Sequence, residues 1–282
     1  MTRVAVVTAC DDAYCLPACV LLHSLGTSAG MPRDTPIIVL ATSLSDESAL
    51  ALKDAAKRAD LNVDLRSADQ ADSFGADEGR FPRAAYVRWS VAEMCGDFDR
   101  IVYLDSDTVV LGPIDELLEA RLEPHHVGAV IDYFYPTIAS APGLRRFSNN
   151  VLLPNAPYFN AGVLLIDVAW WRYQQIGQRA GNFVVRFRDE LELPDQDALN
   201  AVLYNAWCPL DPRWNACPAF IAREIVSRHA ELSHLGSAGL ERIEETESAA
   251  CILHFVGSRK PWAKDFPPSP VKNLYESFMR RT

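Results

Sequence analysis

Short apolar runs alternate with longer segments of helical spacing along most of the chain. The short runs are rich in valine, isoleucine and leucine and predict buried strands, whereas apolar positions three and four residues apart predict helices. Strands are predicted at residues 4–8, 36–41, 61–65, 100–104, 127–131, 159–166 and 251–255. Helices are predicted at residues 16–25, 43–59, 84–94, 168–187 and 195–204. This alternation is typical of an α/β protein built from βαβ units.

Several element boundaries carry residues that favour them. Ser43 or Ser45 is placed to cap the helix at 43–59, and Gly96 follows the helix at 84–94 in a C-cap position. Gly162 interrupts the strand at 159–166, which often marks a close approach by a ligand or by backbone. Residues 140–157 contain three prolines and little periodicity, so we predict a long loop of the kind that often serves as a lid.

Composition narrows the class of protein. The chain has 282 residues, of which 49% are hydrophobic, and no internal repeat or linker is evident. We therefore predict one domain over residues 1–265 and a short tail over residues 266–282 packed on the surface. The formal net charge of −10 argues against a protein that binds nucleic acid.

Cysteine usage and hydropathy bear on the location of the protein. The seven cysteines are odd in number and form no CxxC pair, which indicates reduced thiols rather than a disulfide framework or a zinc site. No apolar stretch reaches the roughly 18 residues that a membrane-spanning helix needs. We expect a cytoplasmic protein, attached to the inner membrane face at most peripherally.

Two carboxylates follow the apolar strand at residues 100–104. Asp105 and Asp107 lie at the carboxyl end of this strand, where open α/β sheets bind their ligands. Alternating side chains of a strand point to opposite faces, so the two can share one ion only if the strand breaks into a turn here. Carboxylate oxygens suit Mg²⁺ or Mn²⁺, which are commonly shared with substrate phosphates.

Three interpretations of this segment remain open on the residues alone. It fits a metal-bound diphosphate, as in enzymes that use sugar nucleotides. It also fits an aspartyl-phosphate phosphatase of the haloacid dehalogenase type, in which Asp105 would be the nucleophile and Asp107 the acid/base. That phosphatase needs a second acidic pair later in the chain, and the only Asp-Asp lies upstream, at residues 11–12. The third interpretation is an acidic turn without chemistry.

Polar residues after the first and the last predicted strands are further candidates. Asp11 could accept from a nucleobase and Tyr14 could stack on it, although Asp11 could equally cap the following helix. His254 could complete a metal site begun by two carboxylates. Gly257 allows close backbone approach to a phosphate, and Lys260 supplies positive charge for it.

Two further segments combine polar side chains with structural signals. Asp195 and Gln196 stand after Pro194 at a predicted helix start, where acidic residues are also favoured for the helix alone. Asn160 stands beside a glycine of a predicted strand and could bind sugar hydroxyls or only satisfy backbone groups. The tryptophans Trp170, Trp171 and Trp207 are interpreted as core residues.

Taken together, these segments resemble the retaining glycosyltransferases of family 8, which include glycogenin, galactinol synthase and bacterial lipopolysaccharide galactosyl- and glucosyltransferases. The resemblance rests on residues 11–14, 86–88, 104–107, 159–167, 195–200 and 254–262, which occur in the order of the family. It implies a GT-A (Rossmann-like) fold, with a mixed, mostly parallel sheet flanked by helices in a single domain. Related bacterial enzymes often carry asparagine where this chain has Ala13, so one nucleotide contact is missing or replaced.

The resemblance also implies a role for each matching residue. Asp105, Asp107 and His254 would bind Mn²⁺, with Mg²⁺ as the alternative. The residues implied in binding the UDP-sugar are Ala9, Asp11, Tyr14, Arg88, Ser106, Asn160, Ala161, Gly257 and Lys260. The residues implied in catalysis at the sugar are Gln196, Asp195 and Asp132.

The expected activity follows from this resemblance. The protein would move a hexose from UDP-galactose or UDP-glucose to a hydroxyl of a glycan, lipooligosaccharide or small-molecule acceptor, with retention of configuration. An amide is a poor nucleophile, so we expect attack from the front face, with Gln196 or Asp195 stabilising an oxocarbenium-like centre. A phosphatase of the haloacid dehalogenase type and a non-catalytic UDP-sugar-binding protein are the alternatives.

Overall fold

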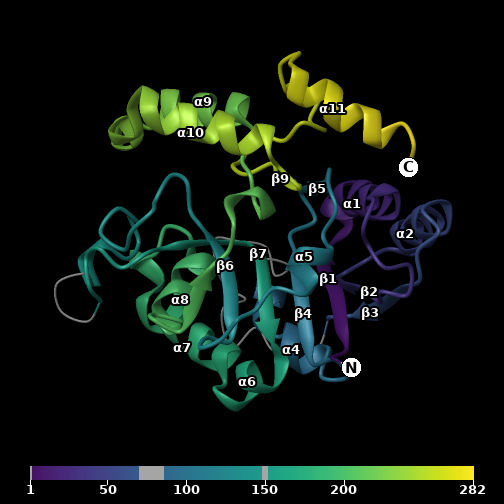
Figure 1. Ribbon diagram of the computed structural model, residues 1–282, viewed down its shortest axis with the longest axis horizontal. Coiled ribbons are helices and arrows are strands. Elements are labelled where there is room, and N and C mark those ends of the chain that lie inside the picture. The colour runs from purple at the N-terminus through teal and green to yellow at the C-terminus, as the bar shows by residue number, and fades with distance from the viewer. Residues whose placement is uncertain (1, 70–85, 148–151) are drawn as a thin grey trace.

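A seven-stranded sheet forms the centre of the molecule (Figure 1). The structure is a computed structural model and describes residues 2–69, 86–147 and 152–282. The strand order is β3-β2-β1-β4-β7-β6-β8. The strands are β1 (Val4–Cys10), β2 (Ile37–Ala41), β3 (Val63–Ser67), β4 (Arg100–Leu104), β6 (Val127–Ile131), β7 (Phe159–Asp167) and β8 (Trp207–Pro209).

The sheet is mixed and mostly parallel, as the sequence predicted. β1 pairs in parallel with β2 and with β4, β2 with β3, and β6 with β8. β7 is antiparallel to both of its neighbours, β4 and β6. The parallel strands β1 and β4 therefore end at the same edge of the sheet, and this edge carries the aspartates of the predicted site.

Helices cover both faces of the sheet because the strands are apolar on both sides. In β1, Val6 and Cys10 pack into one core cluster with α1 and α2, whereas Ala5, Val7 and Ala9 pack into a second cluster on the opposite face with α6, α7 and α8. The helices are α1 (Cys15–Thr27), α2 (Asp46–Arg58), α4 (Val91–Met94), α5 (Asp115–Leu118), α6 (Val168–Tyr173), α7 (Ile176–Phe187) and α8 (Pro194–Val202).

A smaller layer lies over one edge of the main sheet (Figure 1). It contains the two-stranded antiparallel sheet of β5 (Thr108–Val110) and β9 (Ile252–His254). Three helices join it, namely α9 (Ala219–Arg228), α10 (Gly236–Ser248) and α11 (Pro270–Met279). Their apolar side chains form a third core cluster together with Val109 of β5 and Leu253 of β9. The layer is thus anchored to the sheet through the segment that follows β4.

Some predicted helices differ from the observed ones. The helix predicted at residues 84–94 begins outside the described residues, and from Val87 onward it is a 3₁₀ turn (Val87–Trp89) followed by α4. Cys95, not Gly96, is the C-cap of α4. The helix predicted at 168–187 is interrupted between α6 and α7, where Gln175 has a φ of 52°. Of the two candidate caps of α2, Ser45 is the one that accepts from a backbone amide, that of Ser48.

The C-terminal segment contains a helix that the sequence analysis did not predict. Ser269 caps α11 by accepting from the backbone amide of Lys272, and Pro270 occupies the first turn. Val271 and Tyr275 of this helix are buried in the third core cluster. The helices α9 and α10 and the short strand β8 were also not predicted. The predicted loop at 140–157 contains a 3₁₀ turn (Arg145–Phe147), and its residues 148–151 lie outside the described part.

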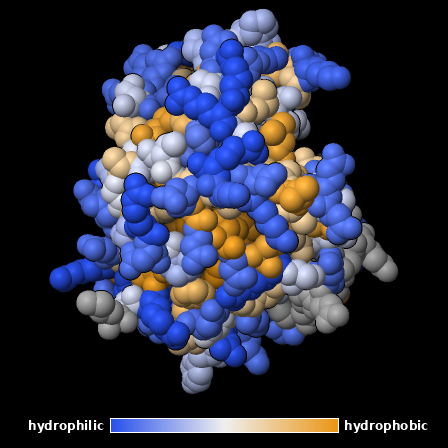
Figure 2. Space-filling model, turned by 90° about the vertical axis from the view of Figure 1, so that its right-hand side faces the viewer, coloured by the Kyte–Doolittle hydropathy of each residue, from blue (hydrophilic) through white to orange (hydrophobic). Residues whose placement is uncertain are grey.

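The side of the molecule on which α2 and β3 lie shows an apolar area bordered by hydrophilic residues (Figure 2). A groove on this side is lined by Leu52 and Ala56 of α2 and by Val63 and Leu65 of β3, with charged residues around them. None of these residues lines the cavity described below. The groove is therefore separate from the candidate site.

Further expectations concern the cysteines, the tryptophans and membrane-spanning helices. All seven cysteines are free, and six of them are buried. Trp171 and Trp207 are buried core residues, and Trp170 packs against the same core. Within the described ranges, none of the helices is long and apolar enough to cross a bilayer.

Candidate active site

The strand β4 breaks where the two aspartates stand. β4 ends at Leu104, a turn carries Asp105 to Asp107, and β5 begins at Thr108 in a different sheet. The backbone amide and the hydroxyl of Thr108 both donate to the carbonyl of Asp105, at 3.1 and 2.7 Å, and close this turn. The alternation of the strand is thereby lost, and both carboxylates can face the same point. This is the break in the strand that the sequence required if the two carboxylates were to share one ion.

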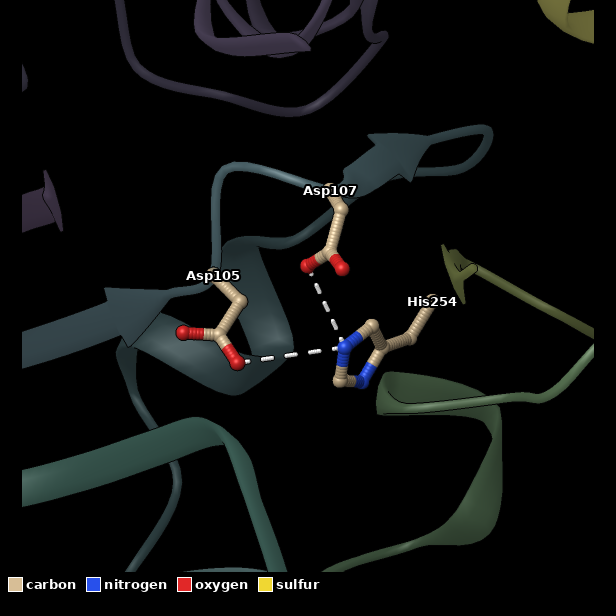
Figure 3. Close-up of side chains that lie close together, drawn as sticks. All are labelled: Asp105, Asp107 and His254. Atoms are coloured by element: carbon tan, nitrogen blue, oxygen red, sulfur yellow. Dashed lines mark ion pairs between the residues drawn. The ribbon is translucent and has the colours of Figure 1, made fainter. Parts of the chain in front are cut away.

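The small sheet brings a histidine to the two carboxylates (Figure 3). Thr108 of β5 pairs with His254 of β9, so residues that are far apart in the chain meet across one ladder. The His254 Nε2 lies 3.3 Å from the Asp107 Oδ1 and 3.8 Å from the Asp105 Oδ2. The structure therefore assembles the three residues that were predicted to hold a metal.

Each carboxylate has one oxygen held by the protein and presents the other to His254. The Asp105 Oδ1 accepts from the Arg88 guanidinium at 2.9 Å and from the Tyr103 hydroxyl at 3.0 Å. The Asp107 Oδ2 accepts from the Lys260 ammonium at 2.5 Å. The opposite oxygens, Asp105 Oδ2 and Asp107 Oδ1, are the ones that face the imidazole.

This donor set fits a divalent cation. In an octahedral site with bonds of about 2.1 Å, neighbouring ligand atoms lie about 3.0 Å apart and opposite ones about 4.2 Å. One ligand atom from each of Asp105, Asp107 and His254 lies within 4.8 Å of the others. Carboxylate oxygens and an imidazole nitrogen are both ligands of divalent cations in proteins.

Burial and neighbouring charges act in opposite directions on the ionisable groups. Burial by itself would raise the pKa of Asp107, but its attraction to Lys260 and His254 outweighs burial and holds the pKa well below its ordinary range. Burial would lower the pKa of Lys260, and the same Asp107 raises it. Asp107 and Lys260 are thus a charged pair in the folded protein.

An irregularity in β7 shapes the floor of the site. The pairing of β7 with β6 shifts between Ala129 and Val130, which pair with Leu164 and Asn160. The intervening residues of β7 are therefore freed from the ladder with β6, and their backbone serves the site. The Ala161 carbonyl accepts from Arg88 at 2.8 Å, and the Ala161 amide donates to Gln196 at 2.9 Å.

Gly162 of β7 lies in close contact with Asp105 and His254 of the cluster. A Cβ atom at this position would lie 2.2 Å from the His254 Cε1, 2.6 Å from its Nδ1 and 3.0 Å from the Asp105 Oδ2. The Gly162 carbonyl also accepts from the Asp105 amide at 2.8 Å. The lack of a side chain at Gly162 therefore makes room for the imidazole of His254, so the close approach here is by a side chain rather than by the ligand or backbone that the sequence suggested.

A buried carboxylate organises the polar residues beside the cluster. Asp132, 4% exposed, accepts from the backbone amides of Phe134 and Tyr135 through Oδ1, and from Asn160 and Gln196 through Oδ2. Burial raises the pKa of Asp132, and these hydrogen bonds oppose the shift. Asp132 thus fixes the side chains of Asn160 and Gln196 in one arrangement.

The orientation of the Gln196 amide follows from its partners. A backbone amide can only donate, so the atom that receives the Ala161 N–H is the Gln196 Oε1. Its Nε2 donates to Asp132 at 3.2 Å and to the Tyr158 hydroxyl at 3.1 Å. Both hydrogens of the amide are used within the protein, and the oxygen keeps one lone pair.

Asp195 and Arg88 line the cavity beside Asp105. The Asp195 Oδ2 lies 3.4 Å from the Arg88 guanidinium, which also contacts Asp105. Burial raises the pKa of Asp195, and Arg88 counteracts the shift. The acidic start of α8 is therefore more than a helix-capping signal, because one of its carboxylates faces the cluster.

The cluster and the polar side chains of Arg88, Asp132, Asn160, Asp195 and Gln196 line one cavity of about 410 Å³, a size typical of small-molecule sites. Helix α9 and the loop after β9 form its other side, where Ile221, Ile225 and Val256 are apolar and Glu224 pairs with Arg228 and Arg259. Ten predicted site residues line the cavity, namely Arg88, Asp105, Asp107, Asp132, Asn160, Asp195, Gln196, His254, Gly257 and Lys260.

Five predicted site residues do not line the cavity. Asp11 accepts from the Tyr14 amide at 3.0 Å and caps a 3₁₀ turn (Asp12–Tyr14), so the structural role that was weighed for it is present. Tyr14 packs edge-on against Trp262, with ring centroids 5.9 Å apart. Ala9, Ser106 and Ala161 are buried. The roles of these five in nucleotide binding stay predictions.

Several residues of the site escaped the sequence analysis. Asn215 hydrogen-bonds to His254 and Asn160, and Tyr158 donates to Asp197 at 2.8 Å. The walls contributed by Phe134, Tyr135 and α9 were also missed. Asp197 stood inside a segment that was already singled out and Tyr158 directly before one, but no local pattern marks Asn215.

The fold and the site together define a glycosyltransferase of the GT-A type. The family model of glycosyl transferase family 8 matches residues 5–265, and the chain belongs to this family. The assignment decides against the phosphatase alternative, because the family model that matches residues 5–265 is one of sugar-transferring enzymes.

Curated relatives support this assignment at low identity. The chain is 28% identical to general stress protein A of Bacillus subtilis over 282 residues, covering 98% of this chain and 93% of that protein. It is 29% identical to lipopolysaccharide 1,2-glucosyltransferase of Escherichia coli and 26% identical to lipopolysaccharide 1,3-galactosyltransferase of Salmonella typhimurium. Each of these two matches covers 64% of this chain but only about half of the relative, 50% and 49%.

Solved structures show the same fold. The galactosyltransferase LgtC, crystallised with donor and acceptor sugar analogues, superposes with a TM-score of 0.75 at 22% identity, covering 98% of this chain and 95% of that one. The bifunctional glycosyltransferase WbbM gives a TM-score of 0.74 at 21% identity, covering 99% of this chain and 49% of that one. The predicted mixed sheet flanked by helices in a single domain is therefore confirmed.

Proposed function

We propose that the protein transfers a hexose from a UDP-sugar to an acceptor hydroxyl, with retention of configuration and with assistance from Mn²⁺. The observation that carries the proposal is the cluster of Asp105, Asp107 and His254 at the cavity that also holds Lys260. Mg²⁺ is the alternative ion. When bound there, the cation would supply positive charge to the leaving diphosphate.

The residues around the cluster fit a nucleotide diphosphate. Lys260 lies at the cluster with its ammonium 2.5 Å from Asp107, so it can offer charge to a phosphate at the same place. Gly257 has a φ of 83°, which favours glycine and exposes backbone to the cavity. Asp11 and Tyr14 stand beyond the end of β1 and would bind the uracil.

The donor sugar would lie between Arg88, Asn160, Asp195 and Gln196. Gln196 has one lone pair of Oε1 left after its hydrogen bonds with the protein, which supports a role in stabilising positive charge better than a role as a nucleophile. Asp195 is paired with Arg88 and would act in the same way. We therefore propose front-face attack by the acceptor, with the diphosphate oxygen taking the acceptor proton.

The donor hexose would be galactose or glucose, because the lipopolysaccharide relatives are a glucosyltransferase and a galactosyltransferase. The acceptor would be a glycan, a lipooligosaccharide or a small molecule, and would enter along the wall that Tyr135 and α9 form. We place the reaction in the cytoplasm because the seven thiols are free, with at most peripheral membrane attachment.

The proposal is tested by calorimetric titration of UDP with and without Mn²⁺. We expect Mn²⁺ to tighten UDP binding in the native protein, and Asp107→Asn and His254→Ala to abolish this gain together with sugar transfer. Asp64→Asn on β3 and His126→Ala, paired with Asp167 at 2.9 Å, are matched controls outside the cavity. Equal UDP affinity in both conditions would contradict metal assistance.

A panel of UDP-sugars identifies the donor. Release of UDP is measured with each sugar in the presence of Mn²⁺, first without an acceptor and then with candidate acceptors. Slow hydrolysis of one UDP-hexose without an acceptor is the expected result. A protein that binds the donors and hydrolyses none would be a binding protein, the remaining alternative.

A further inference from the structure

Asn215 lies next to His254 although the two are distant in the chain. It is 2% exposed and follows the 3₁₀ turn Pro212–Trp214. The next residue, Ala216, forms a parallel bridge with Leu253, and its carbonyl accepts from the His254 amide at 2.8 Å. This backbone pairing holds residue 215 beside the imidazole independently of the contacts of the Asn215 side chain.

The hydrogen bonds of Asn215 determine which nitrogen of His254 carries the proton. The Gly162 amide donates to the Asn160 Oδ1 at 3.0 Å, so this atom is an acceptor. The same Asn160 oxygen receives the Asn215 Nδ2 at 2.9 Å, which places the Asn215 carbonyl oxygen 2.9 Å from the His254 Nδ1. A carbonyl oxygen cannot donate, so the Nδ1 of His254 must carry the hydrogen.

The consequence is a lone pair on the other ring nitrogen. In a neutral imidazole with hydrogen on Nδ1, the Nε2 is unprotonated and can bind a metal. The Nε2 is the atom that faces Asp107 and Asp105. An outer partner of this kind fixes both the tautomer and the orientation of a metal-binding histidine.

We infer that Asn215 is a positioning residue that holds His254 in the metal-binding tautomer and couples it to the sugar side of the cavity. The coupling runs through Asn160, which donates to the Asp132 Oδ2 at 3.1 Å. The same oxygen receives Gln196 at 3.2 Å. One hydrogen-bonded chain thus links a metal ligand to the residue proposed to stabilise the reacting sugar.

The inference rests on the proposed function. Two variants of Asn215 separate its contact with His254 from its contact with Asn160. Asn215→Ala removes both the acceptor for His254 and the donor for Asn160. Asn215→Asp keeps an acceptor for His254 but loses the donor for Asn160. Loss of such an outer partner typically weakens metal binding about 10- to 100-fold.

The first measurement is Mn²⁺ affinity by calorimetry. We expect binding to weaken 10- to 100-fold in Asn215→Ala and to stay within threefold of the native value, or tighten, in Asn215→Asp. Sugar transfer should fall in both variants, because both lose the contact with Asn160. Gly128→Ala on β6, outside the cavity, controls for a general loss of stability.

The second measurement is the nitrogen NMR spectrum of His254 in the metal-free protein, recorded at a pH at which the spectrum shows one unprotonated ring nitrogen. We expect hydrogen on Nδ1 in the native protein and in Asn215→Asp, and a mixture of tautomers in Asn215→Ala. Native Mn²⁺ affinity in Asn215→Ala, or equal loss in both variants, would overturn the inference. A native protein that binds no Mn²⁺ would overturn the proposed function, whereas hydrogen on Nε2 in the native spectrum would overturn the tautomer assignment alone.

Discussion

Replacing Gly162 by alanine should disable the site without unfolding the protein. The new Cβ would lie 2.2 Å from the His254 Cε1, whereas carbon atoms in contact lie about 3.5 Å apart. The imidazole would have to move by about 1.3 Å, well beyond the roughly 0.2 Å tolerance of a metal–ligand bond. The strand cannot yield instead, because Val163 pairs with Leu104 and the Gly162 carbonyl holds the Asp105 amide.

The expected magnitudes follow from this displacement. A misplacement of about 1 Å costs about 100-fold in rate, or about 2.7 kcal/mol in the activation free energy. We expect Mn²⁺ affinity to fall by at least about 10-fold. Crowding in the core should lower the free energy of unfolding by about 1–3 kcal/mol, which a folded variant can tolerate.

The assay combines Mn²⁺ calorimetry, transfer kinetics and thermal unfolding. Gly128→Ala is the matched control, because its Cβ would lie 2.9 Å from Leu210 and 3.0 Å from Leu122, both at the ends of flexible side chains. The control should lose stability and keep its Mn²⁺ affinity. If Gly162→Ala bound Mn²⁺ within twofold of the native protein and kept its transfer rate, the contact with His254 would not matter and the reasoning would fail.

Three further predictions concern α8. Gln196→Ala should lower the transfer rate at least about 10-fold, because a donor to Asp132 and one charge-stabilising oxygen are lost; a full rate in single-turnover kinetics would contradict its role. Asn200→Ala should lower the free energy of unfolding by about 2–4 kcal/mol, because it leaves the buried N–H and C=O of Phe159 without the Asn200 side chain as their partner. Unfolding in urea measures this change, and an unchanged urea midpoint would contradict the prediction. Burial raises the pKa of Asp197 from its ordinary 3.8 to about 6, so the folded state binds this proton more tightly than the unfolded state. The contribution of the protonated Asp197 to the free energy of unfolding is therefore largest below about pH 4 and is lost as the pH rises to about 6. Asp197→Asn should therefore flatten the dependence of stability on pH in this window by up to about 3 kcal/mol, and an identical slope in the two proteins would refute the assignment.

The strands were the easiest elements to predict. Buried parallel strands need apolar side chains on both faces, so the runs at residues 100–104 and 127–131 coincide with β4 and β6. The break between α6 and α7 could not be predicted, because Gln174 and Gln175 both favour helix and only the tertiary structure holds Gln175 at a φ of 52°. By contrast, Ser269 and Pro270 are a start signal for α11 that was overlooked.

The residues of the candidate site also differ in whether the sequence alone could predict them. Asp105 and Asp107 could be predicted because their position after an apolar strand is a local feature of the sequence. Asn215 could not, because its function depends on the bridge between Ala216 and Leu253, which joins two distant segments. Residues that act through another side chain leave no pattern along the chain, so they emerge only when the register of the strands is known.

The pairing of β5 with β9 has a consequence for the order of events during synthesis. All seven strands of the main sheet have left the ribosome once Pro209 has emerged, but His254 has not. Because the chain is made from the N-terminus, all the strands of the main sheet are synthesised before the imidazole that faces its two aspartates. The three side chains proposed to bind the metal are therefore all present only once residue 254 has been added, and a product terminated before that residue would contain all seven strands of the sheet but lack one of the proposed ligands.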